Sequence, residues 1–170
     1  MKVIGVGLGL IGGSALLSLR QNHPEFKLLG VDTNENHLKE ALSLQIIDQK
    51  AEEKDFTDAD LVIVSVPVDM SPQVIQNILE TVGEKTLVLD TGSTKDHVCK
   101  SLASHPKREQ FLATHPIAGT EFSGPQAAFA QLFTGKTLII CEIEKTRFQL
   151  QQLAISLFEK MQMKIRYMNP

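Results

Sequence analysis

The hexapeptide Gly7-Leu8-Gly9-Leu10-Ile11-Gly12 has the spacing G-x-G-x-x-G and stands near the start of the chain. The apolar run Val3–Val6 before it predicts a short buried strand, and the Leu- and Ala-rich segment 10–19 predicts a helix. In that context the glycines suit a tight strand-to-helix turn whose backbone can approach a pyrophosphate group. The free amides at the start of the helix, together with its dipole, would bind the phosphates. The hexapeptide therefore predicts a nucleotide-binding turn in an α/β sheet.

An acidic residue follows this turn at the distance that dinucleotide sites require. Asp32 lies 20 positions after Gly12 (32 minus 12) and stands at the end of a second predicted strand, 28–31. A carboxylate there accepts hydrogen bonds from the adenosine ribose hydroxyls and repels a 2′-phosphate. Because Thr33 and Asn34 supply no arginine to neutralise such a phosphate, the sequence favours NAD over NADP. The alternative interpretation is a plain turn followed by a surface aspartate.

Predicted strands and helices alternate along the rest of the chain. Further strands are expected at 61–66, 86–89, 111–113, 137–141 and 164–168. Further helices are expected at 34–44, 71–82, 95–104 and 150–161, and the irregular acidic segment 45–60 holds at most a short edge strand. This alternation predicts an α/β fold with a doubly wound, mainly parallel sheet and helices on both faces. In such folds ligands bind beyond the carboxyl ends of the strands, so the residues after each strand are candidates for a site.

Three more strand ends carry candidate residues. The Val- and Ile-rich central strand closes on Ser65-Val66-Pro67, although Pro67 by itself would indicate only the end of the strand. Strand 86–89 leads into a loop in which Ser93 or Thr94 could equally serve as a helix cap. Strand 111–113 leads into a glycine-containing loop that begins Thr114-His115-Pro116.

Among the five histidines, His115 alone follows an apolar strand and enters a loop on the expected ligand side. A single histidine is more often structural than catalytic, yet this position suits a general base. A neutral imidazole there would accept the proton of a substrate hydroxyl while hydride leaves the same carbon. Ser93, also at a strand end, would orient the imidazole or the hydroxyl. His97 and Cys99 do not share a helix face, so no metal site is expected.

Composition excludes several classes of protein. A length of 170 residues suits one domain, and the net charge of -3 argues against a nucleic-acid partner. No run approaches the roughly 20 apolar residues of a membrane span, and no secretory leader follows Met1. The two cysteines have no metal or redox spacing, so a reduced, cytoplasmic protein is expected.

Four motifs occur in a fixed order along the chain. They are the glycine-rich turn with Gly13-Ser14, Ser65-Val66-Pro67, Asp90-Thr91-Gly92-Ser93-Thr94-Lys95, and His115-Pro116-Ile117-Ala118-Gly119-Thr120-Glu121 with Ser123-Gly124-Pro125. Together they resemble the motifs of prephenate dehydrogenases and of their relatives that act on arogenate. The first motif is common to many dehydrogenases, whereas the last is much more specific. The resemblance covers nearly the whole chain.

The resemblance implies a Rossmann-type NAD-binding domain over residues 1–168 of an enzyme that oxidatively decarboxylates prephenate to 4-hydroxyphenylpyruvate in tyrosine biosynthesis. By motif position, His115 would be the hydrogen-bond partner of the substrate hydroxyl, with Ser93 its neighbour at the nicotinamide. Thr120 would line the substrate pocket and Glu121 would belong to its gate.

The resemblance also implies a helical domain beyond Pro170 that makes the homodimer and carries an arginine for the substrate carboxylate. These residues alone should then bind NAD and turn over prephenate poorly or not at all. Three alternatives stay open: an arogenate dehydrogenase, a more distant hydroxy-acid dehydrogenase, and a nucleotide-sensing module without chemistry. The last would have no use for His115 beside Ser93.

Overall fold

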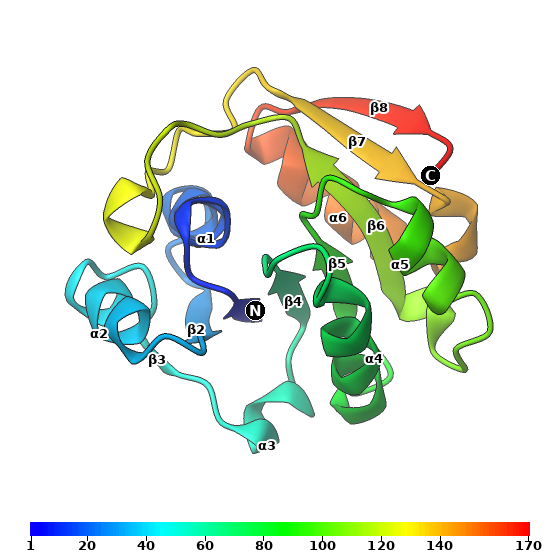
Figure 1. Ribbon diagram of the computed structural model, residues 1–170, viewed down its shortest axis with the longest axis horizontal. Coiled ribbons are helices and arrows are strands. Elements are labelled where there is room, and N and C mark those ends of the chain that lie inside the picture. The colour runs from blue at the N-terminus through cyan, green and yellow to red at the C-terminus, as the bar shows by residue number, and fades with distance from the viewer.

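The computed structural model describes all residues, 1–170, and its centre is one eight-stranded sheet (Figure 1). The strands are β1 (Lys2–Val6), β2 (Lys27–Val31), β3 (Gln49–Lys50), β4 (Leu61–Val64), β5 (Leu87–Asp90), β6 (Phe111–Pro116), β7 (Thr137–Cys141) and β8 (Lys164–Met168). Their order across the sheet is β3-β2-β1-β4-β5-β6-β7-β8. The first six run parallel, β7 is antiparallel to β6, and β8 is parallel to β7. The predicted doubly wound, mainly parallel α/β sheet is confirmed.

Helices cover both faces of this sheet (Figure 1). One face packs against α1 (Leu10–Asn22), α2 (Glu35–Ser43) and α6 (Phe148–Lys160). The other packs against α3 (Glu53–Phe56), α4 (Ser71–Thr81) and α5 (Asp96–Ser101). Because successive strand residues point to opposite faces, the central strands need apolar residues throughout, and all four residues of β4 are buried. No helix combines the length and the apolar character that crossing a bilayer requires.

Several element boundaries differ from those expected. The segment 45–60 contains the helix α3 as well as β3, α5 covers only 96–101, and β4 ends at Val64. The difference at β6 matters most, because this strand extends to Pro116 and so includes His115, which was expected in the following loop. The cause is pairing with β7, in which His115 lies opposite Ile139 and Pro116 opposite Leu138. Such long-range pairing leaves no local periodicity in the sequence.

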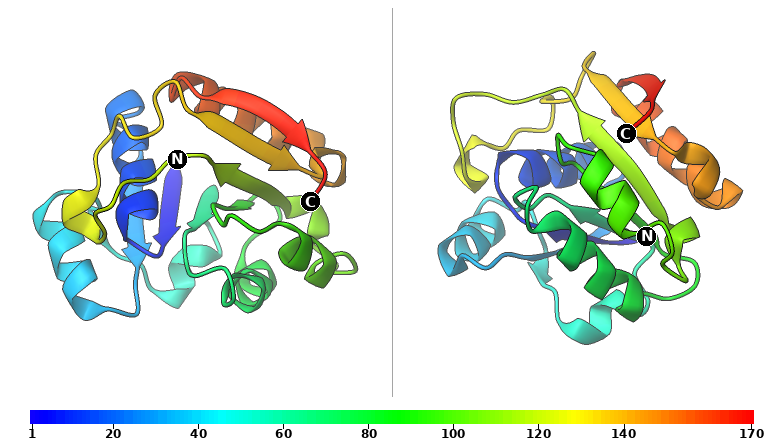
Figure 2. Two further views of the ribbon diagram at one scale, coloured as in Figure 1. Left: turned by 45° about the horizontal axis from the view of Figure 1, so that its top comes forward. Right: turned by 45° about the vertical axis from the view of Figure 1, so that its right-hand side comes forward.

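The connection from β6 to β7 includes most of the fourth motif, 115–125, and runs toward α1 and α2. It contains the short 3-10 helix η2 (Pro125–Ala127), which lies beside α1 and α2 (Figure 2). The amide of Phe129 donates to Ser14 Oγ at 3.1 Å, and a Cβ on Gly13 would lie 2.9 Å from Ala128 Cβ. Since no helix crosses the sheet between β6 and β7, β7 returns antiparallel. The loop of the fourth motif therefore packs on the glycine-rich turn.

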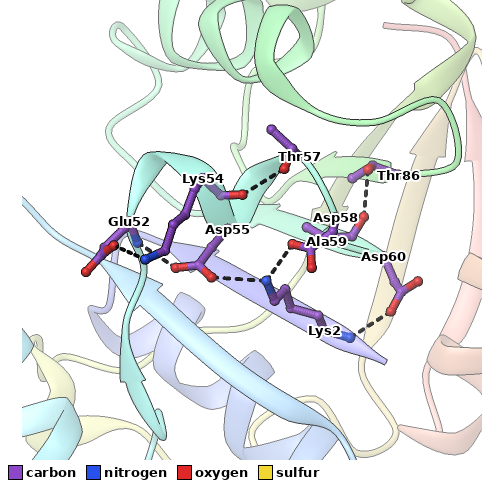
Figure 3. A network of polar contacts seen from close by, with 9 residues as sticks. All are labelled: Lys2, Glu52, Lys54, Asp55, Thr57, Asp58, Ala59, Asp60 and Thr86. Carbon is purple, nitrogen blue, oxygen red and sulfur yellow. Dashed lines mark hydrogen bonds and ion pairs between the residues drawn. The ribbon is translucent and has the colours of Figure 1, made fainter.

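A polar network connects α3 to the amino ends of β1 and β4 (Figure 3). These strand ends lie away from the carboxyl ends, beyond which a ligand is expected. Lys2 Nζ donates to Asp55 at 3.0 Å and also to Asp58, while the Lys2 amide donates to Asp60 at 2.7 Å. Asp55 also accepts the Glu52 amide at 2.9 Å, as part of a capping box for α3. The Glu52 amide and, to a smaller extent, the Lys2 ammonium hold the pKa of Asp55 below its usual range.

Replacement of Asp55 should therefore destabilise the protein in a pH-dependent way. A carboxyl whose pKa is lower in the folded state stabilises that state above its unfolded pKa, and loses this contribution on acidification. We expect Asp55→Asn to lower Tm at pH 7, and the difference from wild type to shrink below about pH 4. Thermal melts followed by circular dichroism measure this, with Asp58→Asn as the control because its side chain is 68% exposed. A difference in Tm that stays constant with pH would contradict the argument.

Candidate functional site

A cleft of ≈ 490 Å³ opens beyond the carboxyl ends of β1, β2 and β4. This is the place where the strand order reverses, which is where doubly wound folds bind their ligands. Six of the residues predicted from the sequence line it together: Gly7, Gly9, Asp32, Ser65, Val66 and Pro67. The fold thus brings two of the four motifs and Asp32 into one cavity.

The glycines of the turn have different roles. Gly7 has φ +89°, and a Cβ there would lie 2.4 Å from the Ser65 carbonyl oxygen. A Cβ on Gly12 would lie 2.0 Å from the Gly7 carbonyl oxygen, so the turn itself requires glycine at both positions. Nothing lies within 4 Å of a Cβ on Gly9. Gly9 therefore leaves open space on the side where a ligand would approach.

Unpaired amides stand at the start of α1, directly after Gly9, which lines the cleft. Gly9 is the N-cap of α1, and no side chain caps the helix. The first amide with a partner is that of Gly13, which donates to the Gly9 carbonyl at 2.8 Å, whereas those of Leu10, Ile11 and Gly12 donate to no group of the chain. Free amides and a positive helix end suit an anion such as a phosphate.

Asp32 is held by three polar contacts. Its Oδ2 accepts the Leu8 amide at 2.8 Å, and its Oδ1 accepts the Asn34 amide at 2.8 Å. His37 Nδ1 lies 3.3 Å from Oδ2. His37 is a residue that was not predicted from the sequence, although its place in the first turn of α2, five residues after Asp32, would allow the ring to contact that carboxylate. Asp32 is consequently fixed at the edge of the cleft, with its side chain 11% exposed.

A buried ion pair joins the ends of β5 and β6. Lys95 Nζ contacts the Asp90 carboxylate, and the two side chains are 5% and 1% exposed. Lys95 Nζ also donates to the Thr114 carbonyl at 2.7 Å, and the Thr114 amide donates to Asp90 Oδ1 at 3.2 Å. Burial raises the pKa of the Asp90 carboxyl, and the Lys95 ammonium opposes that rise. The pair thereby holds the backbone carbonyl and the backbone amide of Thr114, the residue before His115.

The remaining predicted residues lie nearer to β6. His115 is half-buried, and its Nδ1 is buried without a hydrogen-bond partner, whereas its Nε2 is not buried. Ser93 is exposed in the loop after β5, and no hydrogen bond joins it to His115. Thr120 and Glu121 are exposed in the loop after β6, where they line a shallow pocket of ≈ 770 Å³ with Phe122. These four residues are thus separate from the cleft beside Asp32.

Comparison with known proteins places this arrangement in a family. Residues 15–167 match the family described as the nucleotide-binding domain of prephenate dehydrogenase. The chain belongs to this family. The resemblance inferred from the four motifs is therefore confirmed, as is the Rossmann-type fold.

Individual relatives agree with this assignment. Prephenate dehydrogenase from Bacillus subtilis (strain 168) is 33% identical over 148 residues, which are 85% of this chain and 40% of that enzyme. Cyclohexadienyl dehydrogenase from Zymomonas mobilis is 32% identical over 137 residues, 79% of this chain and 47% of that enzyme. The crystal structure of Aquifex aeolicus prephenate dehydrogenase with hydroxyphenyl propionate and NAD+ has a TM-score of 0.91 and 31% identity, covering 100% of this chain and 60% of that one. The chain spans less than half the length of these curated relatives.

Proposed function

We propose that the chain is the NAD-binding part of a prephenate dehydrogenase, which oxidises the C4 hydroxyl of prephenate with loss of the ring carboxylate as carbon dioxide. The observation that carries the proposal is that Gly9, the N-cap of the uncapped helix α1, lines one cleft together with Asp32. The names of the related enzymes support prephenate as the substrate, with arogenate as the alternative.

The residues present fit a dinucleotide. The open space beside Gly9 and the free amides of Leu10–Gly12 would hold the pyrophosphate, and Asp32 would accept hydrogen bonds from the adenosine ribose. Ser65-Val66-Pro67 would line the same cleft beyond β4. When bound, NAD supplies the acceptor for the hydride that leaves C4 of the substrate.

His115 would supply the acid–base chemistry. In this proposal its Nε2 accepts the proton of the C4 hydroxyl, which is consistent with the burial of Nδ1 and the accessibility of Nε2. Ser93 would orient the hydroxyl, while Thr120 would line the substrate pocket and Glu121 would belong to its gate. Because aromatisation drives the reaction, these residues mainly have to position the substrate and take one proton.

The related enzymes extend well beyond the part that matches this chain. We propose that their additional part corresponds to a helical segment that completes the substrate pocket with an arginine and forms a homodimer. Residues 1–168 would then be the NAD-binding domain of a cytoplasmic enzyme, with low turnover in the absence of that segment.

Titration of NAD and NADP into the chain tests the cofactor assignment. Asp32 would repel a 2′-phosphate, and no Lys or Arg lines the cleft to neutralise one. We expect NAD to bind at least about tenfold more tightly than NADP, a difference of about 1.4 kcal/mol. Isothermal titration calorimetry measures both constants. Equal affinities would contradict the role given to Asp32.

Two glycine substitutions should separate binding from folding. Gly9→Ala places a methyl group in open space, so the fold should survive while NAD affinity falls by about tenfold or more. Gly12→Ala forces a methyl group against the Gly7 carbonyl, so both Tm and NAD affinity should fall. Thermal melts and calorimetry on the two variants provide the comparison. If Gly9→Ala bound NAD with wild-type affinity, the proposal that the pyrophosphate lies beside Gly9 would be wrong.

A further inference from the structure

Asp32 has fewer free hydrogen-bonding positions than a ribose with two hydroxyls could use. A carboxylate offers about four lone-pair positions. On Oδ2, one is taken by the Leu8 amide and one faces His37 Nδ1; on Oδ1, one is taken by the Asn34 amide. A single position on Oδ1 remains for a ligand. The orientation of the carboxylate therefore decides whether that position faces the cleft.

His37 is placed to control this orientation. Its side chain is 32% exposed, lines the cleft together with Asp32, and has Nδ1 at 3.3 Å from Asp32 Oδ2. Because an ionised carboxylate only accepts, Nδ1 is the donor in this contact, and in the neutral ring Nε2 then has a lone pair. Nε2 lies on the other side of the ring, 3.9 Å from the position of a Cβ on Gly124. The ring thus lies between Asp32 and Gly124 of the loop after β6.

Charge in the cleft is limited to these two side chains. Asp32 and His37 are the only ionisable residues that line it. A 2′-phosphate beside Asp32 would meet a carboxylate, and the Nδ1–H of His37 is already directed at that carboxylate and not at the phosphate. A ribose 2′-hydroxyl, in contrast, can donate to the carboxylate. The pair therefore favours a hydroxyl over a phosphate more strongly than a carboxylate alone.

We propose that His37 is the positioning residue for Asp32 and that the two together determine the preference for NAD over NADP. This inference rests on the proposed function, since it assigns a further residue to the same cofactor site. Loss of the Nδ1–H donor leaves the Leu8 and Asn34 amides as the only partners of the Asp32 carboxylate, so its orientation is held less tightly and its contact with the ribose is weaker. A cation in place of the ring supplies a partner for a 2′-phosphate.

Calorimetric titration of NAD and NADP into four variants tests the proposal. His37→Leu removes the donor and should weaken NAD binding about tenfold, the size expected for a hydrogen bond to a charged group. His37→Asn keeps a donor near the Nδ1 position and should restore most of that affinity. His37→Arg should bind NADP at least about tenfold more tightly than wild type. His97→Leu is the matched control, because His97 is exposed on α5 and does not line the cleft.

The outcomes separate this inference from the function on which it rests. Unchanged NAD affinity in His37→Leu would overturn the inference. So would an equal loss in His37→Leu and His37→Asn with an unchanged ratio of NAD to NADP affinity, because that result indicates a purely structural role. A wild-type chain that binds neither dinucleotide would overturn the proposed function and this inference with it.

Discussion

His115→Asn should lower kcat for prephenate by about 10²- to 10⁴-fold and leave the Kd for NAD unchanged. The reason is that the amide cannot take the hydroxyl proton, while the cleft beside Asp32 does not include His115. The side chain lies on β6, whose neighbour β5 separates it from β4 and the cleft. Proton acceptance and cofactor binding should therefore respond to different substitutions.

The measurement is NADH formation at saturating prephenate, with the chain joined to the additional helical segment proposed above. The 170-residue chain, assayed alongside, should bind NAD and show little turnover. His97→Asn serves as the control for replacing a histidine, because His97 is exposed on α5. Unchanged kcat in His115→Asn would refute the catalytic role. A parallel loss of NAD binding would instead point to damage to the fold.

The nucleotide turn and the sheet could be predicted because their determinants are local. Gly7, Gly12 and Asp32 belong to one strand-helix-strand unit, in which the spacing of the residues sets their relative positions. The buried strands can be recognised from their runs of apolar residues, and β7 and β8 were predicted with their observed bounds. These features depend on contacts within short segments, which leave a recognisable pattern in the sequence.

The supporting contacts could not be predicted because they depend on how distant segments meet. The extension of β6 through His115 follows from pairing with β7, and the contact of Gly13 with Ala128 follows from the return of the loop over α1. The second partner of Lys95, the Thr114 carbonyl, could not be predicted either, because it is the register of β5 and β6 that brings Thr114 beside Asp90. The motifs and strand ends made Asp90, Lys95 and Thr114 candidates for a role, but the strand register shows which groups they contact.

Lys95→Met should lower the free energy of unfolding by about 3–5 kcal/mol at pH 7. The substitution leaves the Asp90 carboxylate buried without its cation, and the Thr114 carbonyl loses its donor. The double variant Asp90→Asn/Lys95→Met removes both charges and should recover much of this loss, because no unpaired charge is left. Urea unfolding of the single and double variants measures the coupling. Additive effects would show that the two residues do not act as a pair.

The pH dependence of Lys95→Met follows from the sign of the Asp90 pKa. Burial already raises the pKa of Asp90 in the folded protein, and removal of the Lys95 ammonium takes away the main charge that opposes this rise. A carboxyl with a raised folded pKa destabilises the fold above its unfolded pKa, and the penalty is relieved as the pH falls. The loss of stability in Lys95→Met should therefore be smaller at pH 4.5 than at pH 7. An equal loss at both values would mean that packing, and not charge, is the function of Lys95.

Lys95 should also affect the reaction without touching the substrate. It holds the Thr114 carbonyl, and Asp90 holds the Thr114 amide, so the pair sets the backbone that leads into His115. At a temperature where Lys95→Met is folded, kcat should fall while the Kd for NAD stays near its wild-type value. In Lys95→Arg, where a cation is retained, kcat should be closer to wild type. A variant that is fully active while folded would restrict the Asp90–Lys95 pair to stability, and His115 would then owe its orientation to the pairing of β6 with β7 alone.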